Sequence, residues 1–196
     1  IIILIFNLKF ISIPNMKKSK TFLIDIGNSY TQFCQLSEQT IFIDKTILKT
    51  SELNKNKIKK QFENHRCIIS SVVPEKDTLF NALNNSVVFF TDYSHIKDIK
   101  INISNPNELG SDRLINAYAA YKTYGGPCLI IDSGTALTWC FIDETGTYQG
   151  GAIFPGMELC SKALHEHTAK LPLIWVEPKK ETFGKKNRTQ TAPPLT

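Results

Sequence analysis

The chain has 196 residues, of which 42% are hydrophobic and 21% are charged. The length allows one large domain or two small ones, and the composition excludes a collagen-like chain, a wholly disordered chain and a disulfide-dense miniprotein. The formal net charge is +5, and only three of the 23 basic residues are arginine. These values indicate a solvated, lysine-rich surface. We expect no nucleic-acid partner, because proteins that read bases favour arginine forks.

Five cysteines are spread along the chain without a C-x-x-C pair. The odd number and wide spacing argue against a secreted disulfide framework, so we expect a reducing, cytoplasmic environment. Cys128 and Cys140 lie in apolar runs, which favours core thiols.

Residues 1–15 are mostly apolar, and Asn7 and Lys9 interrupt them. The run is shorter than the roughly 20 apolar residues of a membrane helix, and the basic residues follow it, whereas in a signal peptide they precede it. We therefore interpret residues 1–15 as an upstream extension that is not native, with Met16 as the natural start and no membrane association. An N-terminal anchor is the alternative.

Apolar, β-branched runs alternate with helical patterns after residue 20, which indicates the α/β class. An antiparallel meander of three strands should open a mixed sheet. The expected elements of the first half are strands at 21–26, 30–36, 40–48, 67–74 (ending at a proline stop) and 87–90, and helices at 53–64 and 76–84. Those of the second half are a helix at 111–121, strands at 128–132, 136–143 and from Tyr148, a glycine-rich bend at 150–156 and a helix at 157–167.

One short pattern occurs in both halves: an apolar strand that ends in an aspartate, a further residue, a glycine and a small polar residue. The two copies are Ile24-Asp25-Ile26-Gly27-Asn28-Ser29 and Ile131-Asp132-Ser133-Gly134-Thr135-Ala136. The repetition indicates an internal duplication of one strand–turn–strand unit. We therefore expect two similar halves that meet near residues 114–126, with a cleft between Gly27 and Gly134.

A turn of this kind suits a phosphate. Glycine tolerates positive φ, and its missing Cβ lets a phosphate approach the backbone. Turn amides and the hydroxyls of Ser29 or Thr135 can hold phosphate oxygens, and an aspartate can hold a hard cation. One such turn alone is weak support, because most are merely structural. Two such turns on matched strands predict a site in which a polyphosphate is bound from both sides.

The segment NPNELGSDR at 105–113 lies between the two turns. Ser111 or Asp112 can cap the helix that follows, which is a purely structural role. The functional interpretation makes Asp112 a general base and Arg113 a clamp for a substrate carboxylate, near a helix N-terminus that favours anions. We assign none of the four histidines a catalytic or metal-binding role, since His165 and His167 face different sides of a helix.

Six segments occur in one order: DIGNS at 25–29, ISSVVP at 69–74, NP with ELGSDR at 105–113, DSGTA at 132–136, GGAI with PG at 150–156, and TAKLP at 168–172. Jointly they resemble the type III pantothenate kinase family, which belongs to the acetate kinase, sugar kinase, Hsp70 and actin superfamily. The resemblance covers roughly residues 20–184. It implies two RNase H-like halves of the actin-like ATPase type, each a mixed sheet flanked by helices, with the second half incomplete.

By position, the resemblance implies that a first loop and Thr135 bind ATP, and that Asp132 binds a monovalent cation, K⁺ or NH₄⁺. Pantothenate would be held by residues 110–113 (Gly110, Ser111, Asp112 and Arg113), with Asp112 taking the proton from its primary hydroxyl. The residues implied for the first ATP loop are Asp25, Ile26, Gly27, Asn28, Ser29, Tyr30, Thr31 and Gln32. The implied reaction is Mg²⁺-assisted phosphoryl transfer from ATP that gives 4′-phosphopantothenate, the first step of coenzyme A biosynthesis, in a homodimer.

Two features depart from the family. Ile103 stands where some members carry a tyrosine, and the segment 185–196 is polar and proline-rich where the family continues with further helices. We expect an extension at 1–15, a first half at 16–114, a truncated second half at 115–184, and an aberrant, disordered tail at 185–196 after a frameshift or truncation. The alternatives to an active pantothenate kinase are an inactive pseudoenzyme, a transcriptional accessory factor of the same family, and a kinase for another hydroxylated acid.

Overall fold

The structure, a computed structural model, describes residues 20–36, 42–84 and 86–174. These residues form an α/β fold with two sheets and flanking helices, which confirms the predicted fold class. The chain divides into two compact units. Unit 1 contains Ile1–Cys128 and Phe141–Gly150, and unit 2 contains Leu129–Cys140 and Gly151–Thr196. The predicted boundaries of the halves stay predictions, and the extension at 1–15 and the tail at 185–196 lie outside the described residues.

The first sheet has the strand order β3-β2-β1-β4-β5 among the described residues. Its strands are β1 (Thr21–Ile26), β2 (Tyr30–Leu36), β3 (Phe42–Lys49), β4 (Arg66–Ser71) and β5 (Val87–Phe90). Pairing is antiparallel between β1, β2 and β3 and parallel between β1, β4 and β5. The sheet is therefore mixed and opens with the predicted meander.

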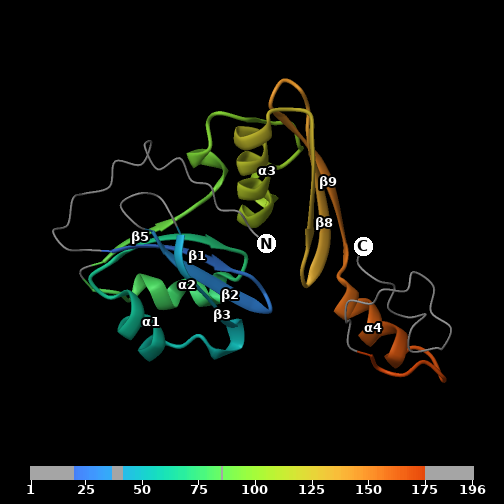
Figure 1. Cartoon of the computed structure of the whole chain (residues 1–196), viewed down its shortest axis with the longest axis horizontal. Coiled ribbons are helices and arrows are strands. Elements are labelled where there is room, and N and C mark those ends of the chain that lie inside the picture. Colours follow the sequence, from blue (N-terminus) through green and yellow to red (C-terminus); the bar gives the residue numbers. More distant parts are fainter. Residues whose placement is uncertain (1–19, 37–41, 85, 175–196) are drawn as a thin grey trace. The chain divides into compact units, whose positions relative to one another are not determined.

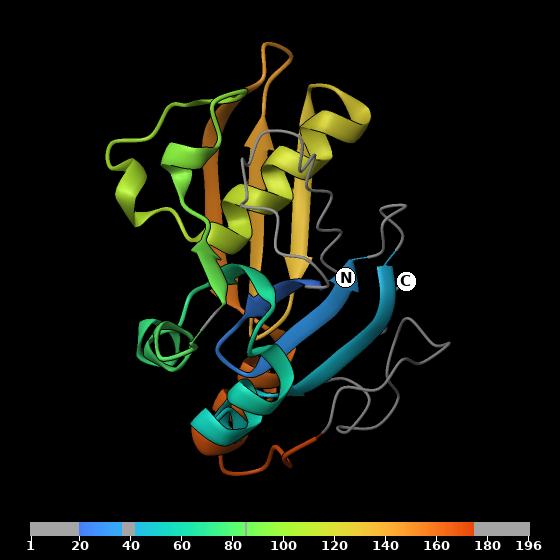
Figure 2. The ribbon, with the colours of Figure 1, turned by 90° about the vertical axis from the view of Figure 1, so that its left-hand side faces the viewer.

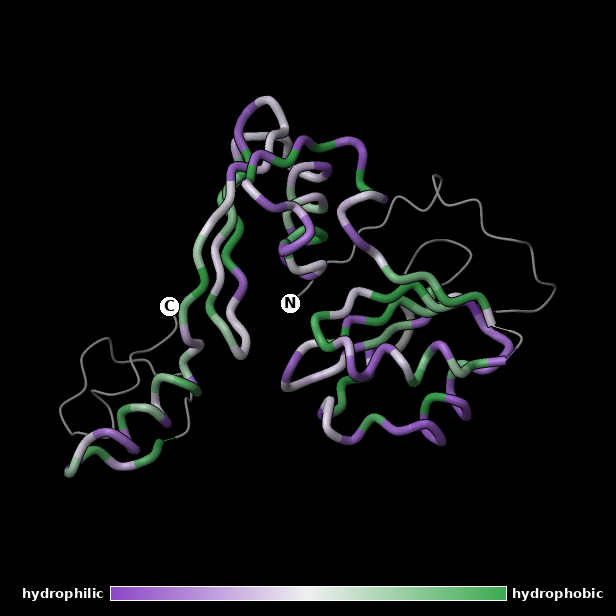
Figure 3. The backbone as a smooth tube through the Cα atoms, turned by 180° about the vertical axis from the view of Figure 1, so that it is seen from behind, coloured by the Kyte–Doolittle hydropathy of each residue, from purple (hydrophilic) through white to green (hydrophobic). Residues whose placement is uncertain are grey.

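Two helices, α1 (Lys55–Phe62) and α2 (Pro74–Asn81), pack on the same face of this sheet (Figure 1). That face carries the alternate residues of β1, which pack with side chains of both helices: Phe22, Ile24, Ile26, Ile58, Phe62 and Phe80. The intervening Leu23 packs with Ile115 of α3 (Ser111–Tyr124), so α3 lies against the opposite face. In Figure 3 the strands of this sheet carry long hydrophobic stretches, whereas α1 is largely hydrophilic.

Two helix starts differ from the predicted boundaries. Asn54 caps α1 by accepting a hydrogen bond from the backbone N–H of Lys57 at 3.0 Å. The strand expected at 67–74 ends at Ser71 instead, and Pro74 is the first residue of α2. Proline suits this position because its fixed φ is helical and the N–H that it lacks would have no partner in the helix.

The second sheet has the order β6-β9-β8-β7 among the described residues. Its strands, shown in Figure 2, are β6 (Lys100–Ile101), β7 (Cys128–Ser133), β8 (Ala136–Ile142) and β9 (Thr147–Pro155). Short turns join β7, β8 and β9, so these neighbours run antiparallel. The two-residue β6, parallel to β9, was not predicted. The bend expected at 150–156 is wrong for residues 150–155, which continue β9 with Gly150 at φ +107°.

Unit 2 leaves many apolar side chains exposed. The large exposed side chains on its strands and on α4 (Met157–Glu166) are Leu129, Ile131, Trp139, Ile153, Phe154, Leu159 and Leu164. The prediction of a core thiol is confirmed for Cys140, which is buried, but Cys128 is only half-buried. No helix among the described residues is long and apolar enough to span a membrane.

Candidate functional site

The first Asp-x-Gly turn joins β1 to β2 through residues 27–29. All six residues of β1 are buried, because this strand lies in the middle of its sheet with helices on both faces. The chain emerges at Gly27, which is half-buried, and Asn28, Ser29 and Tyr30 are exposed. The N–H of Gly27 donates to the carbonyl of Tyr30 at 3.1 Å and closes the turn. That amide is therefore engaged within the hairpin.

The structure gives a reason for glycine at position 27 that differs from the positive φ expected from the sequence. Among the described glycines only Gly125, Gly146 and Gly150 have positive φ, so neither Gly27 nor Gly134 uses this freedom. A Cβ on Gly27 would lie 3.1 Å from the carbonyl oxygen of Tyr30, which is tighter than ordinary van der Waals contact. Close approach of the backbone, rather than an unusual backbone angle, is the local reason for this glycine.

The residues expected to form the first ATP loop fall into two groups. Ile26 packs into the core, and Thr31 is also buried. Asn28 and Ser29 are exposed at the tip of the turn, where their backbone and side chains can reach a ligand. Thr50, which sequence reasoning missed, contacts the same turn from the end of β3, and no sequence signal distinguishes it from other strand-end threonines. The assignment of these residues to ATP stays a prediction.

Asp25 is 6% exposed and lies one residue before the end of β1. Because Phe22, Ile24 and Ile26 face α1 and α2, alternation directs the Asp25 side chain to the face that α3 covers. Its register partner on β4 is Ser70, whose hydroxyl lies 3.1 Å from the hydroxyl of Ser111, the first residue of α3. The aspartate of the first turn and the start of α3 therefore share one face at the carboxyl ends of β1 and β4.

Hydrogen bonds of the Ser111 side chain connect the N-terminus of α3 to β4. The Ser111 hydroxyl donates to the carbonyl of Ser71 at 2.9 Å, and the N–H of Ser71 lies 3.0 Å from the same oxygen. The N-cap residue is Gly110, without a side-chain cap, so the alternative in which Ser111 or Asp112 is the N-cap is wrong. Instead, Asp112 Oδ1 accepts a hydrogen bond from the backbone N–H of Arg113 at 2.7 Å. Both side chains are half-buried in the first turn of the helix.

The first turn and the start of α3 are also linked through Val72. The N–H of Val72 donates to the carbonyl of Ile26 at 3.1 Å. A Cβ on Gly110 would lie 3.6 Å from Val72 Cγ1 and 2.6 Å from Asp112 Oδ1, so the absence of a side chain at Gly110 leaves room for this carboxylate. All of these residues belong to unit 1. The structure thus brings together Asp25, the 27–29 turn and the 110–113 segment.

The second Asp-x-Gly turn lies in unit 2 and is one residue shorter, with Gly134 and Thr135 between β7 and β8. The N–H of Gly134 donates to the carbonyl of Ala136 at 2.9 Å, and that of Gly156 donates to the carbonyl of Thr135 at 3.0 Å. Gly156 is the N-cap of α4, so the start of this helix lies against the turn. Thr135 is exposed and Asp132 is half-buried. That the two turns face each other across a cleft stays a prediction.

Metal binding at these turns would rest on single carboxylates. The described part of the chain contains no group of three or more His, Cys, Asp or Glu residues that could hold a metal ion. Asp25 and Asp132 still offer the hard oxygen atoms that Mg²⁺ and K⁺ prefer, and such cations take further ligands from phosphate and water. The donor chemistry therefore fits cations that enter together with a polyphosphate.

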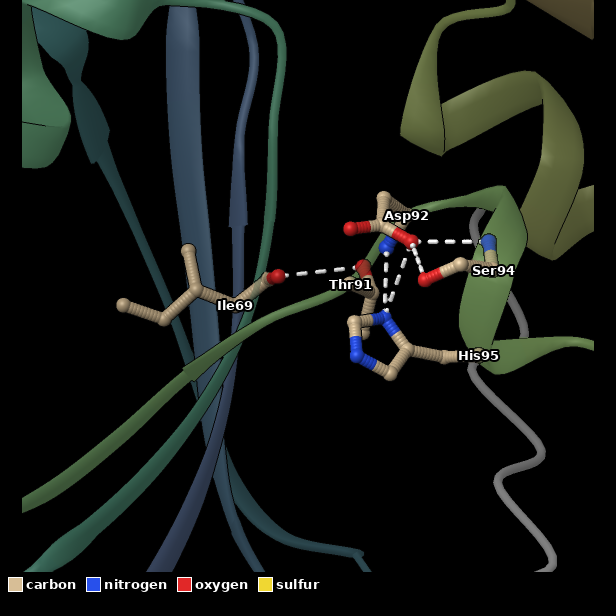
Figure 4. Close-up of polar contacts among 5 residues, drawn as sticks. All are labelled: Ile69, Thr91, Asp92, Ser94 and His95. Atoms are coloured by element: carbon tan, nitrogen blue, oxygen red, sulfur yellow. Dashed lines mark hydrogen bonds and ion pairs between the residues drawn. The ribbon is translucent and has the colours of Figure 1, made fainter. Parts of the chain in front are cut away.

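A separate polar cluster follows β5, where Asp92, Ser94 and His95 form a capped 3-10 turn (Figure 4). Asp92 Oδ1 accepts from the N–H of Ser94 at 2.7 Å and from its hydroxyl at 2.6 Å, and His95 Nδ1 lies 3.1 Å from the same oxygen. Burial alone would raise the pKa of Asp92, but the hydrogen bonds from Ser94 and the nearby His95 lower this pKa overall. Because the Ser94 hydroxyl donates to Asp92 and not to His95, the cluster caps a turn and is no acyl-transfer triad.

The chain is similar to known proteins over most of its length. A family model described as type III pantothenate kinase matches residues 21–192. A type III pantothenate kinase from Persephonella marina is 35% identical over 182 residues, which cover 83% of this chain and 70% of that protein. One from Listeria monocytogenes is 39% identical over 125 residues, which cover 60% of this chain and 47% of that protein.

Among solved structures, a protein described as a conserved Baf family transcriptional activator from Campylobacter jejuni matches with a TM-score of 0.56 and 22% identity. The match covers 87% of this chain and 71% of that one, and it shows that the two chains share a fold.

Proposed function

Because the chain belongs to the type III pantothenate kinase family, we propose that the protein transfers a phosphoryl group from ATP to pantothenate, the first step of coenzyme A biosynthesis. One observation in unit 1 carries the proposal: the 27–29 turn and the N-terminus of α3 lie at the carboxyl ends of β1 and β4. Val72 links this edge to Ile26, and Ser111 links it to α3. Ligands of α/β sheets bind at such carboxyl ends, so a phosphate donor and an acceptor hydroxyl would meet there.

In the proposed complex, ATP contacts the backbone and exposed side chains of the first turn, since Ile26 and Thr31 are buried. Thr135 contacts ATP from the second turn. Asp25 holds Mg²⁺ directly or through water, and Asp132 binds K⁺ or NH₄⁺. When bound, these cations neutralise the phosphate charge that builds up during transfer.

The pantothenate end of the proposed site is the first turn of α3. Its 14 residues give the helix a positive N-terminal end, which favours a bound anion. The guanidinium of Arg113 can pair with the pantothenate carboxylate through two parallel hydrogen bonds, and Asp112 takes the proton from the attacking hydroxyl. The Ser111 hydroxyl is engaged with Ser71, so Ser111 contributes its backbone and its hold on the helix.

The test of this proposal is Asp112→Asn, which keeps the size of the side chain and removes its proton-accepting charge. General-base catalysis is worth about 10² to 10⁴ in rate, so we expect kcat to fall at least about a hundredfold, with ATP affinity and melting temperature nearly unchanged. Arg113→Lys keeps the charge without the fork and should mainly raise KM for pantothenate. Turnover of Asp112→Asn at close to the parental rate would remove Asp112 from the mechanism.

The proposal extends to a cytoplasmic homodimer that needs K⁺ or NH₄⁺. Replacing either ion by Na⁺ should then lower turnover, and sedimentation should show two copies. Nucleotide binding without any turnover by the parental chain would support the inactive pseudoenzyme instead. Salt-dependent DNA binding without turnover would support the accessory factor.

A further inference from the structure

Thr50 contacts both ends of the first Asp-x-Gly turn. It follows β3, opens the 3-10 turn Thr50–Glu52 and is 2% exposed. Its hydroxyl donates to the carbonyl of Gly27 at 2.6 Å, and its N–H donates to the carbonyl of Ser29 at 3.0 Å. The same hydroxyl lies 3.0 Å from that of Thr31, which is also buried. One side chain and its own amide thus hold the carbonyl groups at the first and last positions of the turn.

We propose that Thr50 is a positioning residue that sets the direction of the phosphate-binding amides in this turn. The peptide bonds of the turn are trans, since the cis bond of the described chain is Gly126–Pro127. In a planar trans peptide the carbonyl and the following N–H point in opposite directions. When Thr50 holds the carbonyl of Gly27, the N–H of Asn28 therefore points away from Thr50, at the exposed tip of the turn.

The hydroxyl of Thr50 supplies a hydrogen bond that the sheet does not. Gly27 lies beyond the last register pair of β1 and β2, Ile26 with Thr31, so its carbonyl is outside the strand ladder. Without the hydroxyl, this carbonyl can rotate toward solvent and turn the Asn28 amide with it. Amides held in place bind an anion more strongly than amides that must be reoriented, because no ordering cost accompanies binding.

Thr91 offers a matched control. It is buried, and its hydroxyl donates to a backbone carbonyl, that of Ile69, at 3.0 Å (Figure 4). It follows β5, and β4 separates this strand from β1 and the 27–29 turn in the sheet. Thr91→Val and Thr50→Val therefore remove the same kind of hydrogen bond from the same unit, and only the second change reaches the turn.

This inference rests on the proposed function, because it concerns the affinity of the same turn for ATP. The experiment measures the Kd of Mg·ATP by calorimetry on the whole chain and on variants. Thr50→Val should raise the Kd at least about tenfold, as expected for losing oriented amides, while Thr91→Val should stay within about twofold of the parent. Thr50→Ser keeps the hydroxyl and should restore affinity to within about threefold. Where turnover is measured, Thr50→Val should raise KM for ATP and leave KM for pantothenate unchanged.

Two further variants separate positioning from stability. Thr50→Ala and Thr50→Ser both lack the methyl group and differ only in the hydroxyl. Comparing them therefore shows the effect of the hydroxyl on ATP affinity even if Thr50→Val does not fold. Equal ATP affinity of the Ala and Ser variants, at similar melting temperatures, overturns the proposal. Loss of ATP affinity in Thr91→Val equal to that in Thr50→Val overturns it as well. If the parental chain itself does not bind Mg·ATP, the proposed function fails and this inference fails with it, whereas binding by the parent with no effect at Thr50 overturns the inference alone.

Discussion

Ile24 in unit 1 and Ile131 in unit 2 each precede the aspartate of an Asp-x-Gly turn, yet Ile24 is 0% exposed and Ile131 is 66% exposed. The strand β1 lies between two strands and under helices on both faces, whereas β7 is an edge strand of its sheet among the described residues. A repeated sequence pattern thus produced two hairpins whose turns differ by one residue in length and whose strands differ greatly in burial.

The turns themselves are also supported in different ways. The buried hydroxyl of Thr50, which contacts that of Thr31, holds the first turn. The second turn is held by the backbone of Gly156, which approaches so closely that a Cβ there would overlap the carbonyl oxygen of Gly134. The motif thus determines a hairpin in each unit, while the support of each turn comes from residues outside the motif.

The largest expected effect is the difference in stability between alanine variants of Ile24 and Ile131, which occupy equivalent positions in the two copies of the pattern. Ile24→Ala removes a fully buried side chain and should lower the free energy of unfolding by about 2–5 kcal/mol. Ile131→Ala is the matched control on the exposed strand and should change it by less than about 0.5 kcal/mol. Urea denaturation of both variants measures the difference. A large loss for Ile131→Ala would show that a surface covers β7 in solution, which would end the contrast between the units.

A smaller effect tests the support of the second turn. Gly156→Ala places a Cβ against the carbonyl oxygens of Gly134 and Thr135 and should destabilise unit 2 by about 1–3 kcal/mol, the usual cost of overpacking. Gly134→Ala is the control, since its Cβ would meet only the Ala136 carbonyl at 3.9 Å and its φ is not positive. Hydrogen exchange of the unit 2 amides reports both changes. Equal protection in the two variants would contradict the close contact at Gly156.

A third test concerns the turn between β8 and β9, which the side chain of Asp143 helps to hold together. The carboxylate of Asp143, between β8 and β9, accepts hydrogen bonds from Thr145, Thr147 and Gln149, and these lower its pKa from 3.8 to about 2. A carboxyl group whose pKa is lowered in the folded chain stabilises the fold at pH values above its ordinary pKa of 3.8. This stabilisation is lost as the pH falls through the lowered pKa of about 2. An NMR titration of the carboxyl carbon measures the pKa, and Asp143→Asn should abolish this part of the acid sensitivity. A midpoint near 3.8 would mean that the turn is open in solution.

The smallest expected effect is a difference in reactivity between two thiols, one from each unit. Measuring it leaves the fold unchanged. Burial raises the pKa of Cys67, in β4 of unit 1, to about 12, whereas Cys160 on α4 is exposed. Because the thiolate is the reactive form, a thiol reagent at about pH 8 should label Cys160 readily and Cys67 only after unfolding. Peptide mass mapping distinguishes the two sites. Labelling of Cys67 in the native chain, before unfolding, would show that the first sheet opens around β4.

Much of the fold could be predicted because local signals were strong. The apolar runs predict β1, β2, β5 and β8, and the helix predicted at 111–121 is α3, which continues to Tyr124. The two-residue β6 has no pattern of its own and exists through pairing with β9, which lies far along the chain. Proline at position 74 predicts the end of a strand, yet the same missing N–H suits the start of a helix, and the structure has Pro74 there.

For the candidate site, the amino-acid sequence alone predicts the two Asp-x-Gly turns, the segment at 110–113 and their family, since these are short runs whose chemistry depends on residue type. The folded chain is needed to show that Ser111 bonds to β4, that Asp25 shares a face with the start of α3, and that Thr50 holds the first turn. Each of these contacts joins residues at least 20 positions apart in the chain, through register and packing. The alternation of apolar and polar residues shows that a strand has two faces, but which partner covers each face depends on the assembled sheet.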